Sequence, residues 1–318
     1  MLALCLPLGC SNGGRTMDLY LDAVMLRELG QNELAIEKLK AVTEADPDFT
    51  LAYSELGRAY QAIGNHAAAS DAFKAAVRLD PWSFDACVDL AQAHEGVGEF
   101  AGAAQAYARA GELDPKNLEA QIGAGDCYLK AGQVVRALAH AEAARQIDEE
   151  SRDVSLLLGR AYEAQKDYPL AIQTYRRLWA VDPADSEALL ALGLAYIKNG
   201  QYDQAKAVFE ALVQVRPDQA AYRYLGYCLV NLGDADQAIR TYQKAIEING
   251  EDWQAHRGLG VAYMVKANKT DDAQSEAQAL RHWRRALEIN PNQPKREALE
   301  KLIREHSQTT NPLQGLND

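Results

Sequence analysis

The sequence is poor in the features from which disulfide frameworks and membrane spans are built. Its five cysteines are too few and too scattered in 318 residues to form a disulfide framework. Three of them, Cys87, Cys127 and Cys228, fall within apolar patterns of helical spacing, where a thiol acts as a small hydrophobic group. No apolar run approaches the roughly 20 residues that a membrane-spanning helix needs. The content of 48% hydrophobic and 25% charged residues is that of an ordinary folded chain.

The charge balance disfavours two classes of partner. The chain has 33 basic and 45 acidic residues, a net charge of −12. Nucleic-acid affinity depends on neutralising phosphates with basic side chains, so nucleic acid is not the expected partner. The same excess of acid disfavours docking on anionic lipid through charge.

The patterns of a catalytic or metal site are also missing. The six histidines show no metal-ligand spacing with one another or with the cysteines, and His94 and His256 occupy positions that recur as packing positions. Gly258 and Gly260 follow no predicted strand, so they do not form a phosphate-binding loop. We therefore expect no enzymatic activity, no metal, no cofactor and no small-molecule substrate.

What the sequence has is a repeat. Its prolines mark a period of 34 residues, with Glu149 at the one step where proline is missing: Pro47, Pro81, Pro115, Pro183 and Pro217. A fixed period of this length is typical of a solenoid, in which each unit buries its apolar face against its neighbours. Because solenoids usually supply binding surface, function is to be sought on such a surface.

Several other positions recur with the prolines. The unit that ends at Asp80 contains Tyr53, Leu56, Gly57, Tyr60, Gly64, Ala69, Phe73 and Ala76. A later unit matches it with Leu192, Gly193, Tyr196, Gly200, Ala205 and Phe209. Apolar residues at helical spacing form two blocks per unit with a short glycine-containing turn between them, and proline ends the second block. Each unit is therefore predicted to be a helical hairpin with small residues where the helices approach closely.

This pattern resembles the tetratricopeptide repeat over residues 17–291, in about eight units. The resemblance implies an all-α fold, a right-handed superhelical solenoid whose first helices line a concave groove. Residues 292–306 are predicted to form a capping helix with an apolar stripe of Ala298, Leu299, Leu302 and Ile303. Residues 307–318 have no periodicity and are expected to be a disordered tail.

The eighth unit is longer than the others. It reaches its aromatic residue only at Trp283, about seven residues late, so we expect a longer polar turn around 267–276. Two interpretations of this insertion stay open at this point. It is either a tolerated surface insertion or a binding loop.

The N-terminal segment, residues 1–16, resembles the end of a bacterial lipoprotein signal. Leu8-Gly9-Cys10 would place the lipid on Cys10, followed by a flexible Ser-Asn-Gly-Gly tether. The segment lacks a basic region, its apolar run is short, and Pro7 stands where the family usually has leucine. A start codon upstream would explain the first two departures. The resemblance implies a lipid-anchored protein of the bacterial cell envelope; the alternative is a cytoplasmic protein with a frayed apolar N-terminus.

The residues that would line the groove change character along the chain. In the early units the corresponding positions are polar: Arg27, Arg58, Gln61, Asp85, Gln92, Glu95 and Asp126. In the later units they are mostly apolar, with two arginines beside them: Leu190, Leu194, Ile197, Arg223, Tyr227, Val230, Arg257, Val261 and Met264. A contiguous apolar surface rimmed by charge is typical of a partner site. The alternative is that these side chains pack against neighbouring helices.

These observations predict a non-catalytic scaffold that binds a protein or peptide segment with apolar anchors in its concave groove. A repeat accessory subunit of a glycan or cell-wall assembly machine, and a cytosolic adaptor, are the alternatives. Family members that grip a chaperone's C-terminal carboxylate carry Lys and Asn at set first-helix positions. Those positions here are Tyr20, Val24, Ser54 and Arg58, so that subtype is not expected.

Overall fold

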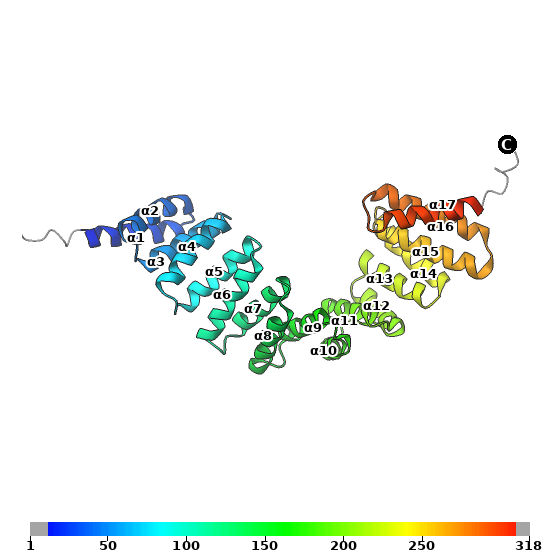
Figure 1. Ribbon diagram of the computed structural model, residues 1–318, viewed down its shortest axis with the longest axis horizontal. Coiled ribbons are helices and arrows are strands. Elements are labelled where there is room, and N and C mark those ends of the chain that lie inside the picture. Colours follow the sequence, from blue (N-terminus) through cyan, green and yellow to red (C-terminus); the bar gives the residue numbers. More distant parts are fainter. Residues whose placement is uncertain (1–11, 310–318) are drawn as a thin grey trace, which may run out of the picture. The chain divides into compact units, whose positions relative to one another are not determined.

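The computed structural model describes the backbone of residues 12–309 and the side chains of residues 14–307. This part of the chain contains seventeen helices and no strand (Figure 1). The prediction of an all-α fold built from helical hairpins is confirmed. The first sixteen helices follow the eight predicted repeats, two to each; the pairs of repeats one to four and six to eight pack as hairpins, and the last helix, α17, follows the eighth.

The helices divide into two compact units, one up to Gln165 and the other from Lys166 onward. The repeat pattern alone predicts one continuous solenoid over 17–291. The first unit holds α1 (Asn12–Glu28), α2 (Asn32–Ala45), α3 (Thr50–Ala62), α4 (His66–Leu79), α5 (Phe84–Gly96), α6 (Phe100–Leu113), α7 (Leu118–Lys130), α8 (Val134–Ile147) and α9 (Arg152–Ala164). The second holds α10 (Tyr168–Val181), α11 (Ser186–Lys198), α12 (Tyr202–Val215), α13 (Gln219–Asn231), α14 (Ala235–Ile248), α15 (Trp253–Thr270), α16 (Ala273–Ile289) and α17 (Arg296–Thr309).

Local residues fix the helix ends. Many helices start after a side chain that accepts a hydrogen bond from the first turn, as Ser83 does for α5 and Asp185 for α11. The periodic prolines follow the second helix of their hairpins by two residues, as Pro81 follows α4. Because proline has no backbone N–H and cannot continue a helix, the 34-residue period sets the length of each hairpin.

The turn inside each hairpin uses a left-handed backbone conformation. Six of these turns place glycine at φ between 73° and 77°: Gly30, Gly64, Gly98, Gly132, Gly200 and Gly233. Lys166 (φ 64°) stands at this position between α9 and α10, and Asp271 (φ 52°) between α15 and α16. Glycine adopts this conformation without steric cost, so the two exceptions carry backbone strain that the other six turns avoid.

In four hairpins an aromatic ring of the second helix packs against a glycine of the first. A Cβ atom on Gly57 would lie 2.5 Å from the ring of Phe73, and one on Gly193 would lie 2.5 Å from the ring of Phe209. The alanines predicted to allow close approach from the second helix are fully buried: Ala69, Ala103, Ala137, Ala171, Ala205 and Ala238. The predicted roles of these small residues are confirmed.

The longer eighth unit has no long loop. Helix α15 has 18 residues and α16 has 17, against 13 and 14 in α13 and α14. The turn between α15 and α16 is only Asp271 and Asp272. The extra residues therefore lengthen both helices, and the expectation of a polar turn over 267–276 is wrong. The polar segment that favoured a loop supplies the exposed ends of two longer helices.

The two ends of the chain also differ from expectation. Helix α1 begins at Asn12, so residues assigned to a flexible tether are helical, and α17 runs from Arg296 to Thr309, past the expected end at 306. In α17, Leu299 is buried against Trp283 and Met264, whereas Leu302 is 40% exposed and Ala298 is also exposed. Only part of the predicted stripe therefore packs. The expected tail beyond Thr309 lies outside the described residues.

Candidate functional site

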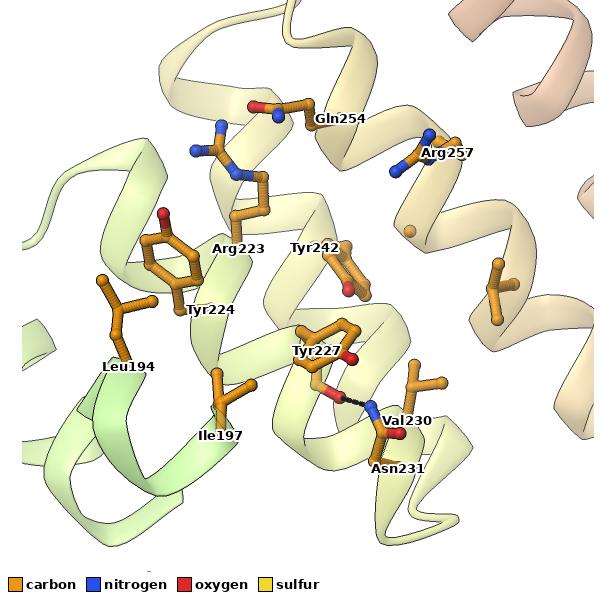
Figure 2. Close-up of a pocket in the computed structure, with 12 residues that line it drawn as sticks. Leu194, Ile197, Arg223, Tyr224, Tyr227, Val230, Asn231, Tyr242, Gln254 and Arg257 are labelled. Atoms are coloured by element: carbon orange, nitrogen blue, oxygen red, sulfur yellow. Dashed lines mark hydrogen bonds between the residues drawn. The ribbon is translucent and has the colours of Figure 1, made fainter. Parts of the chain in front are cut away.

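A pocket lies on the first helices of the last three hairpins, α11, α13 and α15, all in the second unit. Its volume is about 510 Å³. Its lining residues are Leu194, Ile197, Arg223, Tyr224, Tyr227, Val230, Asn231, Tyr242, Gln254, Arg257, Gly258 and Val261. Figure 2 shows Leu194 and Ile197 on α11 at one side, Arg257 on α15 at the other, and Tyr227 on α13 between them. We refer to it as the groove pocket.

The apolar part of the groove pocket is built on Tyr242. This side chain comes from α14, is 3% exposed and reaches the pocket between α13 and α15 (Figure 2). A Cβ atom on Gly258 would lie 2.4 Å from its ring, and one on Gly226 would lie 2.9 Å from it. Burial raises the pKa of the Tyr242 hydroxyl above its ordinary value. The two glycines therefore make the space that lets an aromatic ring form the pocket floor.

Tyr227 is the most prominent apolar side chain at the rim. It is 42% exposed, and its ring lies edge-on to that of Tyr202 with centroids 6.2 Å apart. Its carbonyl oxygen accepts a hydrogen bond of 2.8 Å from the Asn231 side chain, the dashed line in Figure 2. Val261 is also an exposed member of the lining, at 37%. Large apolar side chains are thus presented to solvent on a fixed frame.

The two arginines of the pocket have different partners. Arg223 donates from Nη1 to Oδ2 of Asp252 over 3.0 Å, and the Asp252 side chain is buried and caps α15. Arg257 donates from Nη1 to the carbonyl oxygen of Pro294 over 3.3 Å, and its guanidinium stands 5.3 Å from the Trp253 ring centroid. Arg223 therefore already has a carboxylate partner, whereas Arg257 has only neutral partners among the described residues.

Seven of the nine residues assigned to the groove from the sequence line this pocket: Leu194, Ile197, Arg223, Tyr227, Val230, Arg257 and Val261. Leu190 is half-buried and does not line it. Met264 is 8% exposed and packs with Trp283 and Leu299 in the core beneath the last helix. The assignment of Met264 to the groove is therefore wrong, because α17 closes over the end of the last hairpin.

Five lining residues are absent from the sequence-based set. They are Tyr224, Asn231, Tyr242, Gln254 and Gly258. Tyr242 has the spacing of a core aromatic, and nothing in that spacing shows that its hydroxyl end reaches a surface. The one signal for it is the glycine at 258 on the following first helix, which has no side chain to cover the ring.

The equivalent positions of the first unit bind one another. Arg27 and Arg58 both pair with Glu55, and Arg58 also pairs with Asp89 over 2.9 Å. Further along, Arg160 lies 3.0 Å from Asp126. Burial raises the pKa values of Asp89 and Asp126, and the neighbouring arginines oppose that rise. These positions of the first unit thus form a ladder of internal ion pairs, whereas the groove pocket of the second unit presents apolar side chains.

Other sites considered in the sequence have no structural counterpart in the described residues. Cys10 lies outside them. Within residues 12–309, no group of three or more histidine, cysteine or acidic side chains is placed to hold a metal ion. No helix in that range combines the length and the apolar character needed to cross a bilayer. Burial raises the pKa values of Cys127 and Cys228 to about 12, so these thiols stay protonated and unreactive.

Comparisons with known proteins agree with the hairpin architecture. Family models described as tetratricopeptide repeat match residues 94–161, 129–179 and 162–226, a second such model matches residues 51–81, and one described as TPR repeat matches 24–64 and 226–265. Together with the all-helical fold, these matches place the chain in a class, the helical-hairpin solenoids. The chain belongs to the tetratricopeptide-repeat proteins. No curated protein matches it.

Two solved structures have the same kind of fold. A tetratricopeptide repeat protein from Parabacteroides merdae ATCC 43184 aligns with a TM-score of 0.54 and 17% identity, covering 78% of this chain and 98% of that one. The Cut9–Hcn1 hetero-tetramer of APC/C aligns with a TM-score of 0.54 and 18% identity, covering 90% of this chain and 55% of that one. At these identities the likeness concerns the fold alone.

Proposed function

We propose that this protein is an interaction scaffold whose groove pocket binds one segment of a partner protein. Tetratricopeptide-repeat proteins generally act as scaffolds for protein–protein interaction, and this chain has the repeats. The main support for this site is the contrast between the groove positions of the first unit and those of the second. Groove positions of the first unit neutralise one another, whereas those of the second present exposed Tyr227 and Val261 around a cavity of about 510 Å³.

The lining defines the chemistry of the bound segment. No acidic residue is among the lining residues, and within the described part of the chain Arg257 has no carboxylate partner. A segment with apolar anchors would fill the space against Leu194, Ile197 and the Tyr242 ring, and an acidic residue beside the anchors would reach Arg257. Amphipathic segments commonly bind in grooves in this way, and aromatic and arginine residues tend to dominate the binding energy.

The test is the double substitution Tyr227→Ala and Leu194→Ala, assayed by cross-linking and affinity capture from the native cells. Loss of about 2 kcal/mol or more at such positions weakens binding roughly 30-fold, so partner capture should fall sharply. Val215→Ala is a matched control, because Val215 is also 42% exposed and lies outside the pocket. The melting temperature should change little in both variants. A steep fall for the double variant would mean that the two side chains are core residues and the proposal is wrong.

We propose, as a separate point, that Cys10 carries a lipid that anchors the scaffold in the bacterial envelope. The support is the sequence Leu8-Gly9-Cys10-Ser11, in which a small residue precedes the cysteine. Expressed in its native cells, the protein should sediment with membranes and incorporate labelled fatty acid. Cys10→Ser should abolish both, with Cys87→Ser as a control thiol in the solenoid. A wholly soluble, unlabelled protein with Cys10 intact would contradict the anchor.

A further inference from the structure

A second pocket lies in the last hairpin and shares no lining residue with the groove pocket. It has a volume of about 580 Å³ and is lined by His256 from α15 and by five residues of α16: Arg281, His282, Arg284, Arg285 and Glu288. Three arginines and two histidines thus surround one cavity in a chain whose net charge is −12. We call it the arginine pocket.

Two stacked histidines form one wall of the arginine pocket. His256 is 7% exposed, and its Nε2 lies 3.2 Å from the carbonyl oxygen of Gly250. Because a carbonyl only accepts, His256 donates to it from Nε2, and the Nδ1 atoms of His256 and His282 share a hydrogen bond of 3.1 Å. The two rings stack with centroids 5.3 Å apart, and Tyr263 stacks on His282 at 5.8 Å.

The arginines differ in how far they are neutralised. Arg285 pairs with Glu251 over 2.7 Å and with Glu288 over 3.2 Å. Arg284 donates to the Ser307 hydroxyl over 3.0 Å, which leaves its charge uncompensated. Arg281 forms no hydrogen bond or ion pair with any of the described residues. Neither Arg281 nor Arg284 therefore has a carboxylate within ion-pair distance in the described part of the chain.

The environment of the arginine pocket changes the pKa of His282. Burial, His256 and Arg281 together lower the pKa of His282 to about 4. Arg281 is thus close enough to disfavour a positive charge on the imidazole. The positive charge of Arg281, the smallest of the three causes, would favour an anion beside it.

We propose that the arginine pocket binds a phosphate group, with Arg281 and Arg284 as its ligands. A guanidinium presents paired N–H donors that match two phosphate oxygens, and charge-assisted bonds of this type are among the strongest in proteins. Arg285 is held in place by its two carboxylates and forms a fixed edge of the site. The phosphate comes either free from solution or on a side chain of a bound protein.

Isothermal titration calorimetry of the full chain with inorganic phosphate, at low ionic strength and neutral pH, tests the proposal. We expect measurable binding that Arg281→Gln with Arg284→Gln weakens by about tenfold or more. Arg240→Gln is the matched control, because Arg240 is an exposed residue of α14 that lies outside the pocket. This variant should bind phosphate like the unaltered protein. Equal binding by the double variant, or no binding by the unaltered chain, would overturn the proposal.

Two further measurements complete the phosphate titration. A short phosphoserine peptide and its unphosphorylated form distinguish the sources. Equal affinity for peptide and free phosphate indicates a free anion, and tighter binding of the phosphopeptide alone indicates a group on a partner. If the double variant melts lower because Arg284 has lost Ser307, the single variant Arg281→Gln decides, since Arg281 makes no contact that the fold would lose. Full phosphate affinity in that variant would exclude Arg281 as a ligand.

Discussion

At the scale of single residues, the repeated framework makes exceptions easy to interpret. Six hairpin turns use glycine in the left-handed region, and Lys166 occupies the same place at φ 64°. This turn stands between the two compact units, and α10 begins after a capping aspartate, Asp167. Lys166 therefore carries a steric cost that its counterparts do not.

Replacing Lys166 with glycine should stabilise the protein. The left-handed conformation costs a residue with a Cβ about 1–2 kcal/mol, and the greater freedom of glycine in the unfolded chain offsets part of that gain. We expect a net increase of about 0.5–1 kcal/mol in the free energy of unfolding, measured by chemical denaturation. The converse change at φ 74°, Gly200→Lys, should destabilise by a similar amount. Equal stability of all three proteins would show that the turn relaxes without cost.

The His256–His282 pair makes stability depend on pH. His282 has a pKa of about 4 in the folded chain, lowered by burial and by His256 and Arg281, against about 6.5 when unfolded. Between these values the unfolded state binds the extra proton, so stability is full above about 6.5 and falls as the pH is lowered toward 4.

The measurement is the melting temperature across that range for the unaltered protein and for His282→Asn, which keeps a donor toward His256. The variant should lose less stability on acidification. His140→Asn is the control. Burial also lowers the pKa of His140, but this residue lies in the first unit, so the last hairpin of this variant should keep its pH dependence. Identical pH profiles for the unaltered protein and His282→Asn would contradict the role of the pair.

At the scale of helices, glycines let an aromatic ring pack closely between two helices and so shape the groove pocket. Gly226 and Gly258 lie on α13 and α15 and both face the Tyr242 ring of α14. The ring fills the space between the two helices and still lines the groove pocket. Helix packing and site formation therefore depend on the same contacts.

Gly258→Ala should damage both the packing and the pocket. The added Cβ would lie 2.4 Å from the Tyr242 ring, which is too buried to move freely, and overpacking of this kind costs about 1–3 kcal/mol. Gly250→Ala is the control, since nothing lies within 4 Å of its Cβ position. Chemical denaturation of both variants gives the comparison. An unchanged free energy of unfolding for Gly258→Ala would mean that the Tyr242 ring is not held between the helices.

At the scale of the whole molecule, the described chain is two compact units of the same repeat. In such an array each hairpin contacts only its neighbours, and stability is the sum of local units and their interfaces. Damage is therefore expected to stay largely within the unit that receives it, rather than to unfold the chain as one cooperative block.

Phe209→Ala tests this expectation. Phe209 is fully buried in the second unit against Gly193, and such truncations cost about 3–5 kcal/mol. Hydrogen exchange should speed up for amides of residues 166–309 far more than for those of residues 12–165. Phe73→Ala in the first unit should give the opposite pattern. Uniform loss of protection along the chain in either variant would show that the units unfold together.

The sequence by itself determined the hairpins, their turns and the glycine–aromatic contacts inside them. Each of these depends on residues within one 34-residue unit, and the same pattern recurs in successive units. Seven of the nine groove residues were found because a first-helix position that faces outward in one unit does so in the next.

Only the tertiary structure decided what depends on contacts between side chains of different helices. The pairing of Arg223 with Asp252, the stacking of His256 on His282 and the burial of Met264 under α17 join residues of different helices that share no local pattern. The seven or so extra residues of the eighth unit read as a loop because they are polar, yet they continue two helices whose apolar faces are already fixed by their neighbours. Helical periodicity shows which face of a helix is buried. It does not show which side chain of another helix covers that face, because that depends on how the helices pack.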